Sequence, residues 1–339
     1  MNVDSSAVLL TGPWRHQFVP ANAARFHVAV AGPDEREAPL VVLLHGFPQF
    51  WWAWRHQITA LADAGYRVAA MDLRGTGASD KPPTGYDVPT LTRDVAGLIR
   101  SLGADRAVVV GHGLGGAVAW SMPALQPGVT QAVAALAAPH PLQLHASARG
   151  HLSPTTARHL AFFQLPYLPE RALTHGDLVG RLLREWGVPG WLDDETLATH
   201  RTAARVPFAA HSAMERVRWL VRSTPRVDGR RYLAALRSPA QVPVLQLHGT
   251  SDRCLSAAHA VLPASEAGVA GPQYRFELVE HAGHFLPEEA PERVSELLIE
   301  WLAEVAPLVA PRSDPEARAD AGARLDAGAR SDSDSRTAP

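Results

Sequence analysis

The chain has 339 residues, 46% of them hydrophobic and 19% charged, so it is long and apolar enough to bury a sizeable core. Its formal net charge of −2 provides no basic surface for nucleic acid. No stretch approaches the roughly eighteen consecutive apolar residues of a membrane span. We therefore expect no nucleic-acid partner and no membrane partner, while the oligomeric state stays open.

The N-terminal segment 1–6 has no positively charged region, and the apolar run from Ala7 to Leu10 is too short for a secretory signal. The cytoplasm is the expected location. Cys254 is the only cysteine, so a disulfide within the chain is excluded. No pair of histidines on an expected helix comes with an acidic third ligand, so we expect no metal and no cofactor.

Apolar, β-rich segments alternate with helical patterns over the first 140 residues. Such alternation predicts a mostly parallel sheet flanked by helices. Two further strands and a long helix indicate that the same architecture resumes late in the chain. The expected strands are 25–31, 39–45, 66–72, 106–111, 130–137, 242–248 and 274–280, and the expected core helices are about 55–64, 90–102, 114–126 and 291–305.

Residues 144–236 interrupt this pattern, because they are poor in strands and rich in arginine, leucine and aromatic residues. We interpret them as a helical cap inserted between two parts of one core, 1–143 and 237–305. The cap helices are expected around 155–164, 176–186, 193–203 and 209–223. Residues 306–339 are predicted to be a disordered C-terminal tail, since such a composition buries too little surface to offset its ordering entropy.

The most specific motif follows the strand 106–111, which runs directly into Gly111-His112-Gly113-Leu114-Gly115-Gly116 and then into a helix. A strand, tight turn and helix with small residues at this spacing are typical of the nucleophile elbow of the α/β-hydrolase fold. The central position is Gly113. The glycines after it let the helix pack close to the sheet, and the helix N-terminus directs its dipole at whatever lies above Gly113.

Other motifs fall where that fold requires them. His45-Gly46-Phe47-Pro48 closes an earlier strand, and its Phe47 N–H together with the Leu114 N–H can form an oxyanion hole. We expect a cis peptide before Pro48. Asp252 and His284 follow the last two strands, and the order elbow, acid, histidine matches this fold. Because loops after parallel strands converge, we expect these two side chains to be hydrogen-bonded and to face Gly113.

Three segments carry a family resemblance: Gly46-Phe47-Pro48-Gln49-Phe50-Trp51-Trp52, the stretch 72–82 that begins Asp72-Leu73-Arg74-Gly75, and Ala138-Pro139-His140-Pro141. They resemble soluble epoxide hydrolases and haloalkane dehalogenases. The resemblance implies a capped α/β hydrolase in which an elbow aspartate attacks carbon and a histidine–acid pair then activates water. The dehalogenases have a halide-binding tryptophan directly after the nucleophile, where this chain has Leu114, so dehalogenation is disfavoured.

The chain departs from that family at the chemical centre. Gly113 stands where the family has its aspartate, and glycine can neither attack carbon nor form an ester. The resemblance also implies two cap tyrosines that protonate the epoxide oxygen, but the matching positions are His159 and Val217, with Arg216 as an alternative for the second. Trp51 is expected to wall a lipophilic pocket.

Three functions remain open at this stage. The first is hydrolysis of a small lipophilic substrate by a water that the His284 and Asp252 dyad activates in the space vacated at Gly113. The second is a non-catalytic protein that binds a small ligand. The third is a nucleophile-independent lyase or cofactor-free oxygenase, in which the histidine deprotonates the substrate. Cys254 is an unattractive replacement nucleophile, because free cysteines are usually buried as small hydrophobes.

Overall fold

A computed structural model describes residues 3–147, 154–262 and 267–308. The chain divides into two units, Met1–Pro307 and Leu308–Pro339, and the helices and strands of the described residues lie in the first. From residue 309 onward, the predicted C-terminal tail lies outside the described residues.

An eight-stranded sheet forms the centre of this unit, with the order β1-β2-β4-β3-β5-β6-β7-β8. The pairs β1/β2 and β2/β4 are antiparallel, and every later neighbouring pair is parallel. The predicted mostly parallel sheet is therefore confirmed. The strands are β1 Arg15–Ala21, β2 Ala24–Ala31, β3 Leu40–Leu44, β4 Arg67–Met71, β5 Ala107–His112, β6 Thr130–Leu136, β7 Val244–Gly249 and β8 Tyr274–Val279.

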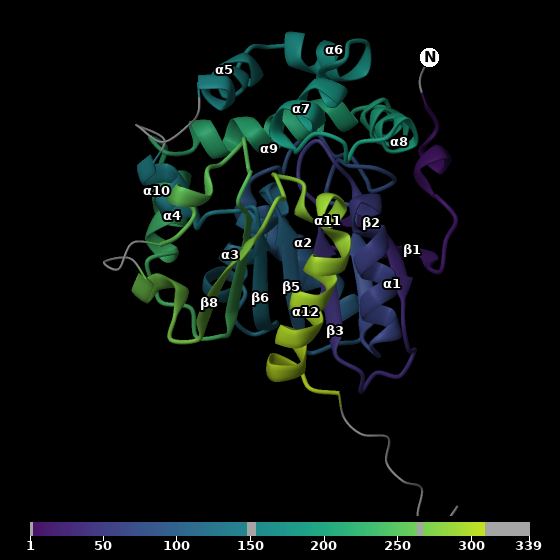
Figure 1. Ribbon diagram of the computed structural model, residues 1–339, viewed down its shortest axis with the longest axis vertical. Helices are drawn as coiled ribbons and strands as arrows, with labels where there is room; N and C mark the ends of the chain where they lie inside the picture. The colour runs from purple at the N-terminus through teal and green to yellow at the C-terminus, as the bar shows by residue number, and fades with distance from the viewer. Residues whose placement is uncertain (1–2, 148–153, 263–266, 309–339) are drawn as a thin grey trace, which may run out of the picture. The chain divides into compact units, whose positions relative to one another are not determined.

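Helices cover both faces of the sheet (Figure 1). Helices α1 and α12 pack together on one face, and α2 and α3 pack together on the other. The helices outside the region between β6 and β7 are α1 Arg55–Asp63, α2 Val88–Ser101, α3 Leu114–Leu125, α11 Leu286–Glu289 and α12 Pro291–Val305.

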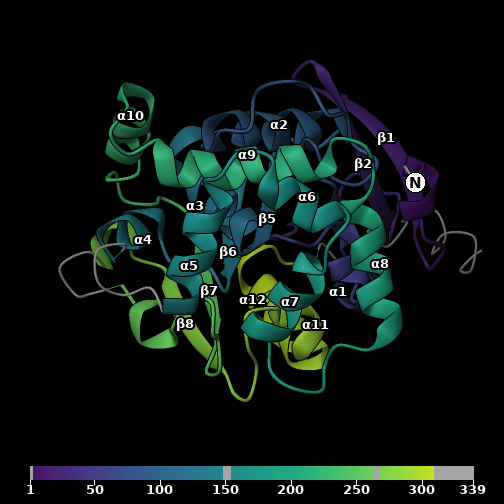
Figure 2. The same cartoon turned by 90° about the horizontal axis from the view of Figure 1, so that it is seen from above.

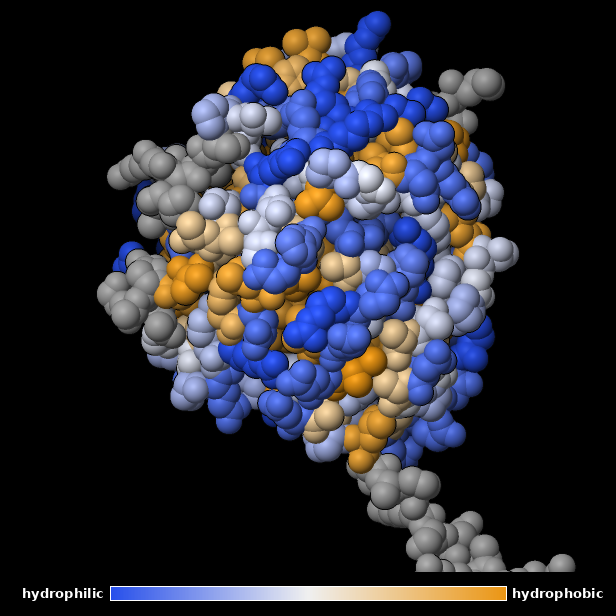
Figure 3. Space-filling view, viewed as in Figure 1, coloured by the Kyte–Doolittle hydropathy of each residue, from blue (hydrophilic) through white to orange (hydrophobic). Residues whose placement is uncertain are grey.

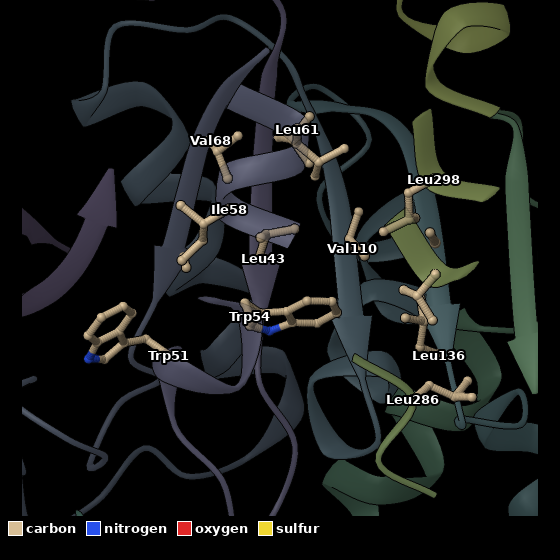
Figure 4. Packing of buried hydrophobic residues seen from close by; sticks show 14 of the residues in the cluster. Leu43, Trp51, Trp54, Ile58, Leu61, Val68, Val110, Leu136, Leu286 and Leu298 are labelled. Carbon is tan, nitrogen blue, oxygen red and sulfur yellow. The ribbon is translucent and has the colours of Figure 1, made fainter. Parts of the chain in front are cut away.

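Alternate residues of the central strands point to opposite faces, as the two-residue period of a strand requires. Leu43 packs in the cluster that contains Ile58 of α1 and Leu298 of α12, whereas Leu44 packs in the cluster with Val118 of α3. All five side chains are fully buried. Figure 4 shows side chains of the first cluster, contributed by strands and by both helices, meeting in one layer. Because both faces are covered, the central strands consist mostly of apolar residues.

Between β6 and β7, the regular secondary structure of the described residues is entirely helical, and the helices are joined by loops. Helices α5 to α9 lie over one end of the sheet, and Figure 2 shows them from above. We refer to α5 to α10 as the cap helices; the cap boundaries 144 and 236 stay predictions. The helices of this region are α4 Pro141–Ser147, α5 Pro154–Phe163, α6 Leu168–Thr174, α7 Leu178–Trp186, α8 Asp194–Ala204, α9 Ala209–Arg222 and α10 Val227–Ala235.

The molecular surface is mixed in character. Hydrophilic residues cover most of the face drawn in Figure 3, and hydrophobic residues appear on it as separate patches. Among the described residues, no helix combines the length and the apolar character that crossing a membrane requires.

Candidate active site

Gly113 occupies the turn between β5 and α3, where it is the residue immediately before the helix. Its φ of 52° and ψ of −113° lie in a region that glycine enters more easily than other residues. A Cβ atom placed at Gly113 would lie 3.5 Å from Nε2 of His284 and 3.7 Å from Cα of Gly46. These are ordinary contact distances, so the site has room for the beginning of a side chain above the turn.

The next glycines serve packing, as the sequence predicts. A Cβ atom at Gly115 would overlap the carbonyl oxygen of Leu44, and one at Gly116 would overlap the side chain of Ala138. Helix α3 therefore lies against the strand ends at a distance that only glycine permits. This close approach brings the N-terminus of α3 to the carboxyl edge of the sheet.

Asp252 and His284 meet beside this turn, in the loops that follow β7 and β8. Nδ1 of His284 hydrogen bonds to Oδ2 of Asp252 at 2.9 Å, which confirms the predicted pairing. The other carboxylate oxygen accepts the backbone N–H groups of Cys254 and Leu255, each at 2.8 Å. His284 is 4% exposed, and no described residue hydrogen bonds to its Nε2. The free nitrogen is the one nearest to Gly113.

The Asp252 carboxylate is held in its charged form. Burial alone would raise its pKa, but the neighbouring His284 and a hydrogen bond from His248 outweigh this effect and lower the pKa well below its usual range. Nε2 of His248 lies 3.2 Å from Oδ2 of Asp252. An ionised carboxylate at Nδ1 favours the tautomer of His284 with its proton on Nδ1, so that Nε2 is free to act as a base.

His112, the last residue of β5, supports the backbone of His284. Its Nε2 lies 2.6 Å from the carbonyl oxygen of His284. Burial is the main cause that lowers the pKa of His112 to about 3, so the ring is neutral at physiological pH. A neutral ring that bonds to a carbonyl must carry its proton on the bonded nitrogen. His112 therefore donates to the His284 carbonyl and fixes the loop that carries the dyad histidine.

The predicted oxyanion hole consists of the backbone N–H groups of Phe47, in the loop after β3, and of Leu114, at the start of α3. The Phe47–Pro48 peptide is cis, as predicted. Leu114 is the first residue of α3, so its backbone N–H has no acceptor within the helix. The Phe47 N–H donates to no described residue. Both N–H groups are thus available to a ligand, and their role in an oxyanion hole stays a prediction.

His159 and Val217, the two cap positions predicted to stand where the family has its tyrosines, are both buried. His159 on α5 hydrogen bonds through Nε2 to Glu185 at 2.6 Å, and its ring stacks on Phe163. Val217 on α9 packs in the same apolar cluster as Phe163. Neither side chain offers a phenol. We call this cluster the cap-core cluster, and its aromatic and sulfur-containing members are Phe47, Phe162, Phe163, Trp186, Trp191, Met214, Cys254 and Phe285.

The cap-core cluster reaches the dyad directly, since the ring of Trp186 lies edge-on to His284 with centroids 5.6 Å apart. Cys254 is buried in the cluster and burial raises the pKa of its thiol, in agreement with its interpretation as a small hydrophobe. Within the described part of the chain, no three His, Cys, Asp or Glu side chains are grouped so as to hold a metal ion.

The expectation that Trp51 walls a lipophilic pocket stays a prediction. Its indole N–H donates to the carbonyl oxygen of Val8 at 3.0 Å, and its backbone N–H donates to Asp72 at 3.1 Å. These bonds hold the ring against Trp14 in the core cluster on the α1 face, where it is fully buried. Figure 4 includes Trp51 among the packed core residues. Trp51 therefore packs in the core cluster on the α1 face.

A buried polar network that the sequence analysis missed joins the cap to the core. Glu288 on α11 is contacted by Arg55, by the amide nitrogen of Gln49 and by Nε2 of His200 on cap helix α8, the last at 2.9 Å. Its carboxylate is fully buried. No local motif marks this network, because its members come from three distant segments of the chain.

Comparison with known proteins agrees with this architecture. The sequence profile of the α/β hydrolase fold family matches residues 39–291. The chain is 34% identical over 300 residues to the AB hydrolase superfamily protein YfhM of Bacillus subtilis, covering 84% of this chain and 97% of that protein. It is 33% identical over 332 residues to epoxide hydrolase A of Mycobacterium tuberculosis, covering 84% of this chain and 96% of that protein.

Solved structures give the same result. Epoxide hydrolase A from Mycobacterium thermoresistibile aligns with a TM-score of 0.71 at 28% identity, covering 85% of this chain and 98% of that one. An epoxide hydrolase from an endophytic Streptomyces aligns with a TM-score of 0.70 at 27% identity, covering 86% and 96%. The chain belongs to the α/β-hydrolase fold family. Within that family it is epoxide hydrolase-like.

Proposed function

We propose that this protein hydrolyses a small lipophilic substrate with a water molecule that His284 and Asp252 activate directly, without a covalent intermediate. The carrying observation is that Nε2 of His284 has no hydrogen-bond partner among the described residues and lies 3.5 Å from the position of a Cβ at Gly113. The nucleophile position of the family thus becomes the place of the attacking water. The apolar cap-core cluster around the dyad favours a lipophilic substrate.

The mechanism follows from the geometry. Nε2 of His284 takes a proton from the water as the water oxygen attacks the electrophilic carbon, and the Asp252 carboxylate stabilises the resulting imidazolium. The N–H groups of Phe47 and Leu114 stabilise the developing negative oxygen. The imidazolium then returns the proton to the leaving oxygen, so that the dyad is regenerated.

Turnover by this route is expected to be slow. Loss of the nucleophile costs on the order of a millionfold in a serine hydrolase, while roughly 10³–10⁴-fold acceleration over water survives from binding and the oxyanion hole. Epoxides are expected to react more slowly than activated esters, since His159 and Val217 supply no phenol to protonate the epoxide oxygen.

The test is turnover of a panel of small esters and epoxides by the wild-type protein, by His284→Ala and by His175→Ala. His175 is an exposed cap residue and serves as the matched control. We expect turnover that His284→Ala abolishes and His175→Ala leaves unchanged. Turnover that survives His284→Ala would contradict the proposal. A panel that yields no turnover, together with thermal stabilisation by one of its members, would instead favour a non-catalytic ligand-binding protein.

A further inference from the structure

Arg216 on cap helix α9 is a buried cation without a carboxylate partner. Three arginines are buried in the described part of the chain, and the other two, Arg74 and Arg218, pair with Asp94 and with glutamates. No described carboxylate oxygen lies within 4.0 Å of the Arg216 guanidinium. That guanidinium donates to the carbonyl oxygen of Arg74 and, at 2.7 Å, to the hydroxyl of Thr76.

The same arginine lines a small cavity between the cap and the core, with a volume of about 30 Å³. Phe47, Pro48, Gln49 and Thr76 line it from the core, and its cap side consists of Leu173 and of alanines of α8 and α9 as well as Arg216. A space of roughly 10–15 Å³ holds one water, so the cavity accommodates two to three water-sized groups. The two oxygens of a carboxylate and a neighbouring hydroxyl oxygen are groups of that size.

Two polar groups of the cavity lining have hydrogen-bonding capacity that the described residues do not use. The Thr76 hydroxyl accepts a hydrogen bond from Arg216 and has no other bond to a described residue, so its own proton is free to donate. The amide nitrogen of Gln49 donates to Glu288, while its Oε1 atom is buried without a partner. The lining therefore offers a cation and a hydroxyl donor toward an anion, and one acceptor for a neighbouring hydroxyl.

Burying a charge without a counterion is costly, so an unpaired buried arginine indicates that a counter-charge arrives from outside. Burial lowers the pKa of Arg216 to about 10, and the group remains protonated at neutral pH. Tyr86 and Asp72 act on it electrostatically, and the Asp72 carboxylate lies beyond 4.0 Å. Asp72 itself is engaged by His27 at 2.8 Å.

We propose that this cavity binds the carboxylate group of a small hydroxy acid, with Arg216 and Thr76 donating to the carboxylate and Gln49 accepting from the hydroxyl. Planar guanidinium groups match carboxylates better than ammonium groups do. The proposal goes beyond the proposed function and does not depend on it. It links to the candidate active site through Phe47, which lines the cavity and supplies an N–H group to the predicted oxyanion hole.

The probe is glycolate, with the uncharged glycolamide as its matched comparison, in calorimetric titrations at constant ionic strength. We expect the wild-type protein to bind glycolate at least tenfold more tightly than glycolamide. Arg216→Gln should lose at least tenfold in glycolate affinity, and Arg216→Lys should lose less, because it keeps the charge. Arg222→Gln removes the same charge from an exposed position on the same helix and should bind glycolate like the wild type.

Equal affinities for glycolate and glycolamide, or unchanged glycolate binding by Arg216→Gln, would overturn the proposal. If Arg216→Gln does not fold, Thr76→Val decides, since it removes one donor at constant shape. A several-fold loss of glycolate affinity supports the site, and unchanged affinity overturns it. His284→Ala separates the two proposals: it should abolish turnover while leaving glycolate binding intact, because His284 does not line the cavity.

Discussion

Asp252 and His284 lie 32 residues apart and are joined by a hydrogen bond of 2.9 Å between Oδ2 and Nδ1. The bond lies beside Gly113, the predicted nucleophile position, and it leaves Nε2 of the imidazole without a partner among the described residues. Two backbone N–H groups hold the opposite carboxylate oxygen. The carboxylate is thus fixed on one side and orients the histidine on the other.

Replacing the carboxylate by an amide tests this orientation. Asp252→Asn should fold, because the amide keeps the size of the side chain. Turnover should fall to about the level of His284→Ala, since an amide does not stabilise the imidazolium and favours the wrong tautomer. The measurement is kcat on the best substrate of the panel. Asp228→Asn, at an exposed position of α10, is the control and should match the wild type.

The buried network at Glu288 makes stability depend on pH. Burial would raise the pKa of Glu288, but His200 and Arg55 outweigh it and lower the pKa from its usual 4.5 to about 2. The unfolded chain therefore binds more protons than the folded one between pH 4.5 and pH 2. The free energy of unfolding should rise with pH through this window by about 3 kcal/mol from this group.

Glu288→Gln removes that contribution. We expect its free energy of unfolding to be lower by about 3 kcal/mol at pH 7, with a weaker pH dependence below pH 4.5 than in the wild type. Urea unfolding at a series of pH values measures both quantities. Glu296→Gln, on the exposed side of α12, should leave the pH profile unchanged. Parallel pH profiles for Glu288→Gln and the wild type would refute the assigned pKa.

Helix α3 should tolerate no side chain at its contact with the sheet. A methyl group at Gly115 would overlap the backbone of Leu44 and His45, which cannot move without displacing β3. Gly115→Ala should therefore lower stability by about 1–3 kcal/mol. Gly128→Ala is the matched control, because a Cβ atom there meets nothing within 4 Å. Thermal unfolding of the two variants measures the difference, and equal melting temperatures would contradict the packing argument.

The sequence predicts the core and the dyad because their signals are local. Each parallel strand is a short apolar run, and the loops that carry Gly113, Asp252 and His284 directly follow such runs. Strand β1 escaped prediction because it lies at the edge of the sheet, contains Pro20 and buries only two residues. Helices α6 and α10 were also missed; both are short, and α10 contains Gly229, which weakens the helical pattern.

The functional details that were missed are long-range. Nothing near Trp51 in the sequence indicates that its indole N–H donates to the carbonyl oxygen of Val8. The partners of Glu288 lie 88, 233 and 239 positions away. Arg216 was noticed only as a possible alignment to a tyrosine. The absence of a described carboxylate near Arg216 follows from how α9 packs on the core. The pattern of apolar residues along the sequence does not reveal this packing.

Restoring the family carboxylate tests whether the rest of the site is intact. Gly113→Asp should fold with a stability loss of about 1–3 kcal/mol, because a residue with a β-carbon must adopt the positive φ of 52°. Space is not the obstacle, since the new Cβ atom would lie 3.5 Å from His284. We expect the introduced aspartate to attack activated electrophiles and form an ester, visible as a mass increase of the intact protein.

The matched control is Gly113→Asn, which carries the same backbone cost and nearly the same shape but no nucleophilic carboxylate. Only the aspartate variant should gain mass, and peptide mapping should place the adduct at position 113. Adding His284→Ala to Gly113→Asp should then trap the ester, since no base remains to activate the water that hydrolyses it. A folded Gly113→Asp variant that forms no adduct, or an asparagine variant that labels equally, would show that position 113 does not face the reacting carbon. In that case the open space above Gly113 would have to be assigned to packing and not to chemistry.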